Sequence, residues 1–274
     1  MMLRNSSAAD GPWTVVDGVP DFWTQVRAAP HRLLGLDYDG TLAPFHVIRE
    51  AAVPVPGVKE TLLAIRDETD TTVILLTGRP AKQVQALLGA EVKIPIIGSH
   101  GSEVLNADGS VRLLPPEMRQ QDGLRRAWKS AVEAGYGSRL EKKLASIALH
   151  TREAPDAAEI ETTVEERWWP LTFDHNLEIL RFNGGIELRA RGRNKGIAFA
   201  AHFAAMPSGT LPVYLGDDAT DEDVFQTIRL RGIGIKVGDG ISPTAAAGRL
   251  SGPPAVLDLL KNWRRALAPS DTST

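Results

Sequence analysis

Two aspartates, one residue apart, end a short apolar segment near the beginning of the chain. Residues 33–42 read LLGLDYDGTL, with Asp37 and Asp39 directly after the apolar run. Side chains two residues apart in a β-strand point to the same side, so these carboxylates repel each other. Asp39-Gly40 alone could be an ordinary turn, because Asp-Gly is a common turn dipeptide. A turn does not require Asp37, however, and the pair needs a positive charge nearby.

A second acidic group ends the apolar segment LPVYLGDD, residues 211–218. Asp217 and Asp218 close this segment, and Asp221 follows three residues later. Acidic residues are favoured in the first turn of a helix, which explains part of the group. If both acidic segments meet at one edge of a sheet, a divalent cation would offset their repulsion. Carboxylate oxygens without histidine or cysteine suit Mg²⁺, so the sequence predicts a magnesium site.

Two further positions could bind a phosphate group. Thr77 follows a third apolar segment and could cap a helix, hold a phosphate with its hydroxyl beside exposed backbone N–H groups, or do both. Lys195 follows Asn194, which is a good helix N-cap, so Lys195 should lie in a first helical turn. The helix dipole does not favour a cation there. Lys195 therefore either faces a negative group or is an ordinary solvated lysine.

Short apolar segments recur along the chain and alternate with helical patterns. Each segment ends in polar residues or glycine; they span 33–40, 71–79, 94–101, 211–218 and 232–240. Continuous apolar runs indicate strands that are covered on both faces, as in a parallel sheet. Apolar residues at helical spacing lie between them, at 58–68, 81–89 and 194–206. This alternation predicts a doubly wound α/β domain, whose ligands bind at the carboxyl ends of the strands.

Residues 113–192 have a different pattern, in which polar and apolar residues alternate as in antiparallel strands with one solvated face. Helical patterns cover 118–135 and 154–168, and we expect Pro155 in the first turn of the second helix. Residues 138–152 should form a strand pair or one bent strand. Residues 177–190 should form a hairpin around Asn183-Gly184-Gly185.

The sequence therefore predicts an α/β protein: a doubly wound, Rossmann-like parallel-sheet core with a smaller inserted α+β cap domain. We expect the core at 1–112 and 193–268, the cap at 113–192 and a disordered tail at 269–274.

Composition excludes several classes of function. The chain has 274 residues, 43% of them apolar, and a formal net charge of -3, so a nucleic-acid partner is not expected. It has no cysteine, which excludes disulfides, zinc-thiolate sites and thiol catalysis and favours a cytoplasmic location. The first residues lack the apolar core of a signal peptide, and the apolar runs are too short to cross a bilayer. No membrane partner is expected, and the composition is compatible with a monomer.

The order of these motifs is more specific than any one of them. D-x-D-G-T, T-G-R, Lys-Gly and G-D-D-x-x-D-E, each at an expected strand or helix end, resemble the haloacid dehalogenase superfamily of phosphotransferases. The finer pattern is similar to the trehalose-6-phosphate phosphatase family. It comprises DYDGTL at 37–42, TGR at 77–79, GSHG at 98–101, ALHTR at 148–152, GGIELR at 184–189, NKG at 194–196 and GDDATDEDVF at 216–225. That family has its type-2 cap between the second and third motifs.

The resemblance implies a phosphatase that acts through an aspartyl-phosphate. Asp37 matches the nucleophile, and Asp39 matches the acid that protonates the leaving sugar oxygen and then activates water. Asp39 must hold a proton when substrate arrives. Thr77 and Lys195 match the groups that bind the non-bridging phosphate oxygens.

The resemblance also implies a magnesium cofactor. Asp37, the backbone carbonyl of Asp39, and Asp217 would bind Mg²⁺. Asp218 and Asp221 would not bind the metal directly but would orient its water ligands and Lys195.

The expected cap should select the sugar. In the resembled family a Glu-x-Lys pair and a second glutamate bind the distal glucose, and here these match Glu141, Lys143 and Glu187. The lysine could also be an ordinary surface residue. Further substrate contacts are expected from Arg79, His100 and Arg189.

Two alternatives remain open from the sequence. One is another sugar-phosphate phosphatase, for sucrose phosphate or mannosylglycerate phosphate, or a phosphohexomutase, which would need a second phosphate contact in the cap. The other is a catalytically silent, sugar-phosphate-binding regulatory domain.

Overall fold

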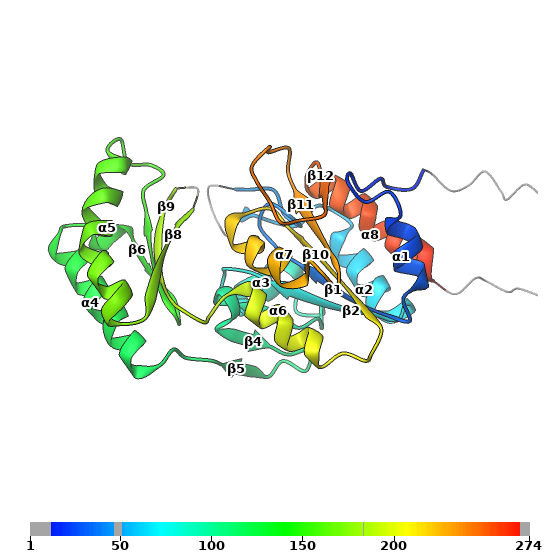
Figure 1. The fold of residues 1–274 in the computed structure, drawn as a ribbon, viewed down its shortest axis with the longest axis horizontal. Coiled ribbons are helices and arrows are strands. Elements are labelled where there is room, and N and C mark those ends of the chain that lie inside the picture. The colour runs from blue at the N-terminus through cyan, green and yellow to red at the C-terminus, as the bar shows by residue number, and fades with distance from the viewer. Residues whose placement is uncertain (1–11, 47–50, 183, 269–274) are drawn as a thin grey trace, which may run out of the picture.

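A large, mostly parallel sheet forms the centre of the molecule (Figure 1). The structure is a computed structural model that describes residues 12–46, 51–182 and 184–268. The eight strands lie in the order β12-β11-β10-β1-β2-β3-β4-β5; β4 is antiparallel to both β3 and β5, and the other neighbouring pairs of this sheet are parallel. Their bounds are β1 His31–Leu36, β2 Thr71–Leu76, β3 Ile96–Gly98, β4 Glu103–Leu105, β5 Val111–Leu113, β10 Thr210–Gly216, β11 Ile233–Val237 and β12 Gly248–Leu250.

Helices cover both faces of this sheet, because successive residues of its strands point to opposite sides. Leu34 and Leu36 of β1 pack in one apolar cluster with α1, α2, α3 and α8, whereas Leu33 packs in another with α6 and α7. The helices are α1 Phe22–Ala28, α2 Val58–Glu68, α3 Ala81–Leu88, α6 Lys195–Ala204, α7 Glu222–Ile228 and α8 Pro253–Leu267. The predicted doubly wound α/β fold is confirmed.

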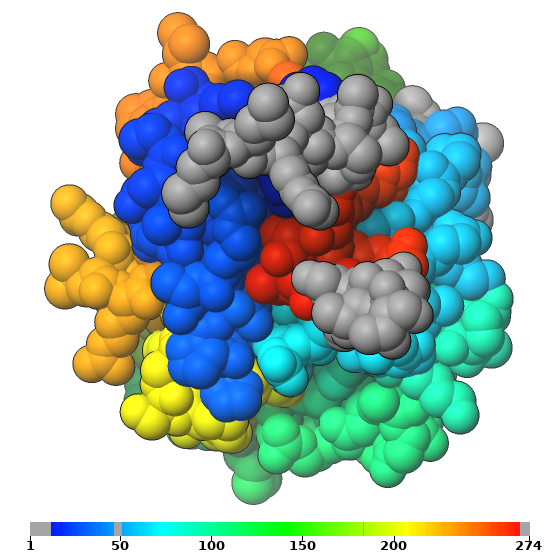
Figure 2. All heavy atoms as spheres, turned by 90° about the vertical axis from the view of Figure 1, so that its right-hand side faces the viewer, coloured from blue at the N-terminus to red at the C-terminus, as the bar shows by residue number. Residues whose placement is uncertain are grey.

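Helices α1 and α8 lie side by side at the end of the molecule that Figure 2 shows, in blue and red. The rings of Phe22 and Trp263 are 6.1 Å apart between centroids. Asn262 Nδ2 also donates a hydrogen bond of 2.8 Å to Thr14 Oγ1. The first and last described segments therefore pack together and stabilise the same end of the molecule.

A second sheet with two helices forms a smaller unit, residues 118–190, here called the small unit; the rest is the large unit. Its antiparallel strand order is β6-β7-β9-β8. Both helices cover one face of the sheet, and the other face is turned toward the large unit (Figure 1). The bounds are α4 Met118–Glu133, β6 Leu140–Lys142, β7 Ser146–His150, α5 Ala157–Asp174, β8 Leu177–Phe182 and β9 Gly185–Ala190.

The small sheet has one apolar face and one polar face, as the alternating sequence predicts. Ile186 and Leu188 of β9 pack with α4 and α5 in an apolar cluster that also contains the buried Trp168. Glu187 and Arg189 alternate with Ile186 and Leu188 along β9, so they point to the opposite face of the sheet. That polar face is the one turned toward the large unit.

Residues 138–152 form the strand pair β6 and β7, which confirms the first of the two predicted alternatives. Two other local predictions need correction. Helix α5 begins at Ala157, so Pro155 precedes the helix instead of lying in its first turn, while Pro170 is inside it. Leu113 ends β5 of the large sheet and thus falls on the core side of the predicted cap boundary. The 112/113 and 192/193 boundaries otherwise stay predictions, and Asn183 and the tail 269–274 lie outside the described residues.

No helix in the described ranges has the length and apolar character that crossing a membrane requires.

Candidate active site

The carboxyl ends of three adjacent strands bring the predicted catalytic residues together. Strand β1 lies between β10 and β2 in parallel register, so the residues that follow these strands share one edge of the sheet. Asp37 follows β1, Thr77 follows β2 and Asp217 follows β10. Lys195, the first residue of α6, approaches from the helix layer.

Lys195 faces two carboxylates and is not a solvated lysine. Its Nζ donates to Asp37 Oδ1 and to Asp221 Oδ1, each at 2.8 Å. Asn194 caps α6 by accepting from the N–H of Ile197 at 2.8 Å, which fixes Lys195 in the first turn. Burial alone would lower the pKa of Lys195, but Asp221 and Asp37 raise it well above its ordinary value. The lysine is therefore a fixed positive charge beside Asp37.

Asp221 holds this lysine in place. Its Oδ1 also accepts from the Tyr214 hydroxyl at 2.5 Å, and its Oδ2 accepts from the backbone N–H of Asp218 at 3.0 Å. Asp218 Oδ1 accepts from the N–H and the hydroxyl of Thr220, each at 2.7 Å. The acidic loop is thus organised by its own hydrogen bonds, and Asp221 is fully buried.

A group of carboxylate oxygens at the sheet edge suits a hard divalent cation. Oxygens of Asp37, Asp217 and Asp221 lie within 4.8 Å of one another. Asp217 Oδ1 is buried and accepts no hydrogen bond within the described part of the chain. Burial, Asp218 and Asp221 raise the pKa of Asp217 to about 7. A crowded, oxygen-only donor set with an unsatisfied buried oxygen fits Mg²⁺.

Gly40 is required by the position of Asp217. Its φ is +74°, and a Cβ at this residue would lie 2.2 Å from Asp217 Oδ2. A side chain here would therefore displace the carboxylate that follows β10. The D-G step of the DYDGTL motif thus has a steric role at the acidic edge as well as a turn role.

The Thr77-Gly78-Arg79 segment forms the other side of the site. Thr77 is buried, and its Oγ1 accepts from the N–H of Arg79 at 3.1 Å. Helix α3 begins only at Ala81 with Pro80 as its N-cap, so Thr77 is not the helix cap. Arg79 Nε and Nη2 donate to the two carboxylate oxygens of Asp39 at 2.6 and 2.5 Å. Both oxygens of Asp39 are thus engaged by a bidentate pair with the Arg79 guanidinium.

A cleft of about 1020 Å³ lies between the two units above these residues. Asp37, Lys195 and Asp217 line its floor. The polar face of the small sheet lines its opposite wall. Of the predicted site residues, the cleft is lined by Asp37, Asp39, Arg79, His100, Glu141, Lys143, Glu187, Lys195, Asp217 and Asp218.

Three of these residues meet at a contact between the two units. Lys143 Nζ donates to Glu187 Oε2 at 3.1 Å, and His100 Nε2 of the large unit lies 3.7 Å from the same oxygen. Burial, together with the nearby lysines, lowers the pKa of His100 to about 4. Burial alone would raise the pKa of Glu187, but His100 and Lys143 lower it to about 2. At neutral pH the contact therefore joins a neutral imidazole to a carboxylate.

The backbone also fixes His100 beside the Thr77-Gly78-Arg79 segment. His100 has a φ of +54°, which is uncommon for a non-glycine residue. A Cβ at Gly78 would lie 2.6 Å from His100 Nε2, so only glycine lets the imidazole take this position.

Glu141 pairs with a residue that sequence reasoning did not assign to the site. His150 Nε2 lies 2.8 Å from Glu141 Oε2, and both line the cleft. Ala148 of β7 pairs with Glu141 on one side and with Glu187 on the other, so it lies on the same face of the sheet as these two residues. Every second residue of a strand points to the same face, which places His150 and then Arg152 there as well. That periodicity in the ALHTR segment could have identified them. Phe45, Arg139, Arg181 and Phe182 also line the cleft and were not predicted.

Arg189 and Thr77 are absent from the cleft lining, unlike the other predicted substrate and phosphate contacts. Arg189 Nε donates to Glu178 Oε1 at 2.6 Å, and its Nη2 donates to Asp223 Oδ2 at 3.2 Å. In this arrangement Arg189 bridges the two units.

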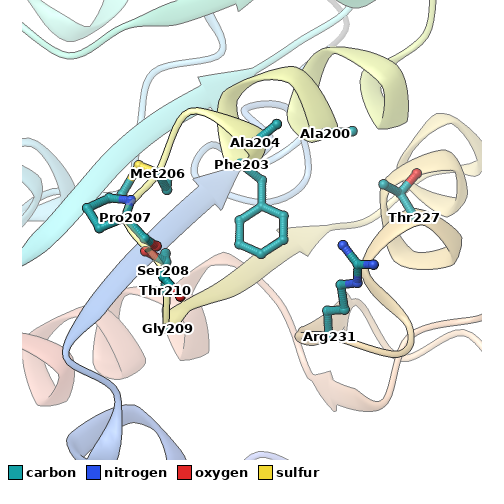
Figure 3. Close-up of a pocket in the computed structure, with 10 residues that line it drawn as sticks. All are labelled: Ala200, Phe203, Ala204, Met206, Pro207, Ser208, Gly209, Thr210, Thr227 and Arg231. Atoms are coloured by element: carbon teal, nitrogen blue, oxygen red, sulfur yellow. Dashed lines mark hydrogen bonds between the residues drawn. The ribbon is translucent and has the colours of Figure 1, made fainter.

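A second hollow of about 480 Å³ lies at the opposite, amino end of β10 (Figure 3). The Phe203 ring lies at its centre, with Met206 and Pro207 on one side and Arg231 on the other. Arg231 is the one charged residue in its described lining. The acidic and phosphate-binding groups that line the cleft are missing from this described lining, so the cleft is the candidate active site.

The chain is similar to known phosphatases over most of its length. The family model described as trehalose-phosphatase matches residues 35–251. A trehalose-6-phosphate phosphatase of Escherichia coli is 31% identical over 239 residues, which cover 84% of this chain and 86% of that protein. A probable trehalose-phosphate phosphatase of Sinorhizobium fredii is 30% identical, covering 83% and 85%. A solved C-terminal domain of C. albicans trehalose-6-phosphate phosphatase has a TM-score of 0.75 at 21% identity, covers 93% and 99%, and supports the fold alone.

Proposed function

This chain belongs to the trehalose-phosphatase family and is a phosphatase, and we propose that it hydrolyses trehalose 6-phosphate to trehalose and phosphate. One observation carries the proposal. A single cleft has Asp37, Lys195 and Asp217 on its floor, and Glu141, Lys143 and Glu187 on its opposite wall. Phosphate chemistry and sugar-binding groups thus face each other across a space large enough for a disaccharide phosphate.

Asp37 is the proposed nucleophile. Its carboxylate attacks phosphorus in line, the bond to the sugar oxygen breaks, and an aspartyl-phosphate forms on Asp37. Lys195 Nζ, 2.8 Å from Asp37, lies where it can also bind a non-bridging phosphate oxygen and hold the charge during transfer. The Thr77 hydroxyl and the neighbouring backbone N–H groups would bind another oxygen.

Asp37 and Asp217, with the backbone carbonyl of Asp39, would hold Mg²⁺, while Asp221 and Asp218 keep Lys195 and the acidic loop in place. When bound, the cation supplies positive charge that offsets the repulsion between the anionic nucleophile and a phosphate dianion. The carboxylate oxygens clustered within 4.8 Å and the unsatisfied Asp217 Oδ1 support this assignment.

Asp39 is the proposed acid, which protonates the leaving sugar oxygen, and the proposed base, which takes a proton from the water that attacks the aspartyl-phosphate, breaks its bond to Asp37 and releases inorganic phosphate. It lies on the cleft beside Asp37, but Arg79 holds it as an ion pair. A phosphate that arrives in the cleft offers Arg79 a second anionic partner with bidentate geometry. Transfer of Arg79 to the phosphate would leave Asp39 free to hold the proton that the leaving sugar oxygen needs.

The small unit is the proposed cap, and its polar face is the proposed sugar-binding surface. Glu141, Lys143 and Glu187 present charged groups that bind hydroxyls well, and His100 completes this wall from the large unit. Closure of the cap over the bound sugar phosphate would exclude water from the phosphate site.

A phosphohexomutase is the second candidate. Such an enzyme needs a second phosphate contact on the cap, and Arg139, Arg152 and Arg181 line the cleft from that side. Arg181 is engaged by Glu161 at 3.0 Å and by Glu165, however, and the chain belongs to a phosphatase family.

One assay tests both candidates. Trehalose 6-phosphate, sucrose 6-phosphate and glucose 6-phosphate are incubated with Mg²⁺ or with EDTA, and inorganic phosphate and sugar products are measured. We expect phosphate release from trehalose 6-phosphate at the highest kcat/KM, and none with EDTA. Preference for another substrate, an isomerised hexose phosphate as main product, or full activity in EDTA would contradict the respective part of the proposal.

A further inference from the structure

Arg189 joins the two units through a shielded pair of contacts. Its Nε donates to Glu178 Oε1 at 2.6 Å, and its Nη2 donates to Asp223 Oδ2 at 3.2 Å. Glu178 lies on β8 of the small unit, and Asp223 lies in the first turn of α7 of the large unit. Only 4% of Arg189 is exposed, so solvent and salt weaken the pair less than they weaken a surface ion pair.

Asp223 is rigidly connected to the catalytic groups. A Cβ at Gly196 would lie 2.3 Å from the carbonyl oxygen of Asp223, so the first turns of α6 and α7 are in direct contact. Lys195 begins α6, and Asp221 immediately precedes α7. A group bound to Asp223 is therefore held in register with both residues.

Two adjacent backbone segments connect the small unit to the large unit. They are residues 114–117 and 191–194, which lie side by side, since Arg193 Nη2 donates to the carbonyl oxygen of Pro115 at 3.4 Å. Gly192 has a φ of +77°, a conformation that suits a bend. Two adjacent connections can act as a hinge, so side-chain contacts must set the tilt.

The contact of His100 with Glu187 also joins the two units, but its electrostatic attraction is weaker. His100 Nε2 lies 3.7 Å from Glu187 Oε2, and the pKa of His100 is lowered to about 4 by burial. At neutral pH this contact lacks the attraction of a full ion pair. The pair of Arg189 and Asp223 supplies that attraction on the α7 side.

We propose that Arg189 is a positioning residue that sets the tilt of the small unit over the phosphate site through its ion pair with Asp223. The inference rests on the proposed function, because it assigns sugar binding to Glu187 and Lys143 of the small unit. Arg189 does not touch the substrate. It keeps Glu187, two residues earlier on the same strand face, opposite the floor of the cleft.

The two partners of Arg189 provide a matched pair of variants. Asp223→Asn removes the charge that attracts Arg189 across the two units, whereas Glu178→Gln removes the charge of a partner within the small unit and leaves Arg189 paired with Asp223. We expect Asp223→Asn to raise KM for trehalose 6-phosphate about three- to tenfold, as loss of a shielded ion pair implies. We expect Glu178→Gln to change that KM less than about twofold, because the lost contact lies within the small unit and Arg189 keeps its partner on the large unit. Turnover of 4-nitrophenyl phosphate, which does not need the sugar wall, should stay within about twofold of wild type in both variants.

A distance measurement tests the tilt without any enzymatic activity. The chain has no cysteine, so Glu166→Cys on α5 and Ser208→Cys after α6 provide two unique sites for spin labels. Both residues are exposed. We expect a narrow distance distribution in the doubly labelled parent and in its Glu178→Gln form, and a broader, longer distribution in its Asp223→Asn form.

The label distances decide the inference separately from the proposed function. An Asp223→Asn distribution identical to that of the parent would overturn the role of Arg189, whatever the kinetics show. Equal broadening in both variants would also overturn it, since it would indicate a merely structural role of Arg189. If the wild-type chain releases no phosphate from trehalose 6-phosphate, the proposed function fails, and the distances still test the tilt.

Discussion

Lys195 Nζ lies 2.8 Å from Asp37 Oδ1, although 158 positions separate the two residues in the chain. Both side chains are almost fully buried, and Asp221 accepts from the same ammonium. A buried ion pair of this kind is weak support for stability, because removing two charges from water costs about as much as their attraction returns. The arrangement is better explained by chemistry at Asp37, which needs a positive charge beside it when a phosphate arrives.

The first prediction concerns this aspartate. Asp37→Asn should lower phosphate release by about 10⁴-fold or more, because an amide cannot form the aspartyl-phosphate. Burial raises the pKa of Asp37 well above its ordinary value, so loss of its charge should leave the thermal midpoint equal or higher. Phosphate release and calorimetry of the same preparation measure both effects.

Asp67→Asn is the matched control for Asp37→Asn. Asp67 is an exposed aspartate of α2, so its variant should keep wild-type activity. If Asp37→Asn kept more than a few per cent of the activity, another residue would have to be the nucleophile.

The second prediction uses two glycines with similar backbone angles. Gly40 and Gly109 have φ values of +74° and +85°, but a Cβ would lie 2.2 Å from Asp217 Oδ2 at Gly40 and meets nothing within 4 Å at Gly109. Both alanine variants should lose about 1 kcal/mol of stability from the unfavourable φ. Only Gly40→Ala should also lose Mg²⁺ binding and activity. Titration calorimetry with Mg²⁺ measures the difference, and normal metal affinity in Gly40→Ala would exclude Asp217 as a metal ligand.

The sequence could predict the floor of the cleft because local rules fix the positions of its residues. Asp37 and Asp217 follow apolar strands, and Asn194 caps the helix that begins with Lys195. Parallel topology then places the ends of β10, β1 and β2 at one edge. Each step depends on residues that are close in sequence or on a general rule of α/β sheets.

The contacts of long side chains between distant segments could not be predicted in the same way. The alternation of β9 correctly places Arg189 on the polar face, but only the packing of the units shows that it reaches Asp223 and not the cleft. The pairing of Arg79 with Asp39 likewise joins residues 40 positions apart in the chain. The choice of partner depends on geometry that sequence patterns do not contain.

The third prediction concerns acid stability. Burial lowers the pKa of His100 from 6.5 to about 4. Between these values the unfolded chain binds a proton at His100 that the folded chain does not bind, so the free energy of unfolding falls as the pH is lowered. The loss should reach about 3 kcal/mol by pH 4, because each pH unit between the two pKa values is worth about 1.4 kcal/mol.

His100→Asn should remove this part of the acid dependence. Asparagine tolerates the φ of +54° at this position better than most residues. Urea unfolding of both proteins from pH 7 to pH 4 measures the effect. Parallel curves of stability against pH for the variant and the wild type would show that His100 is not the group responsible.

The fourth prediction separates recognition of the sugar from phosphate chemistry. Glu187 lies on the wall of the cleft, where Lys143 Nζ donates to it at 3.1 Å. Glu187→Gln keeps the shape of the side chain but removes the charge that binds hydroxyl groups. We expect kcat/KM for trehalose 6-phosphate to fall by about 10- to 100-fold, as loss of a charged hydrogen bond implies. The value for 4-nitrophenyl phosphate should change by less than about threefold, because only the floor of the cleft acts on this substrate.

Glu159→Gln, an exposed glutamate in the first turn of α5, is the control for a change of charge within the same unit. It should leave both kcat/KM values unchanged. Thermal unfolding of Glu187→Gln must also be measured, because the variant leaves the buried Lys143 without its carboxylate partner and should be less stable. Equal losses of kcat/KM on both substrates, in a variant that remains folded at the assay temperature, would mean that Glu187 supports the site as a whole. A loss confined to trehalose 6-phosphate would instead show that the polar face of the small sheet recognises the sugar, while Asp37 and Lys195 act on any phosphate that reaches them.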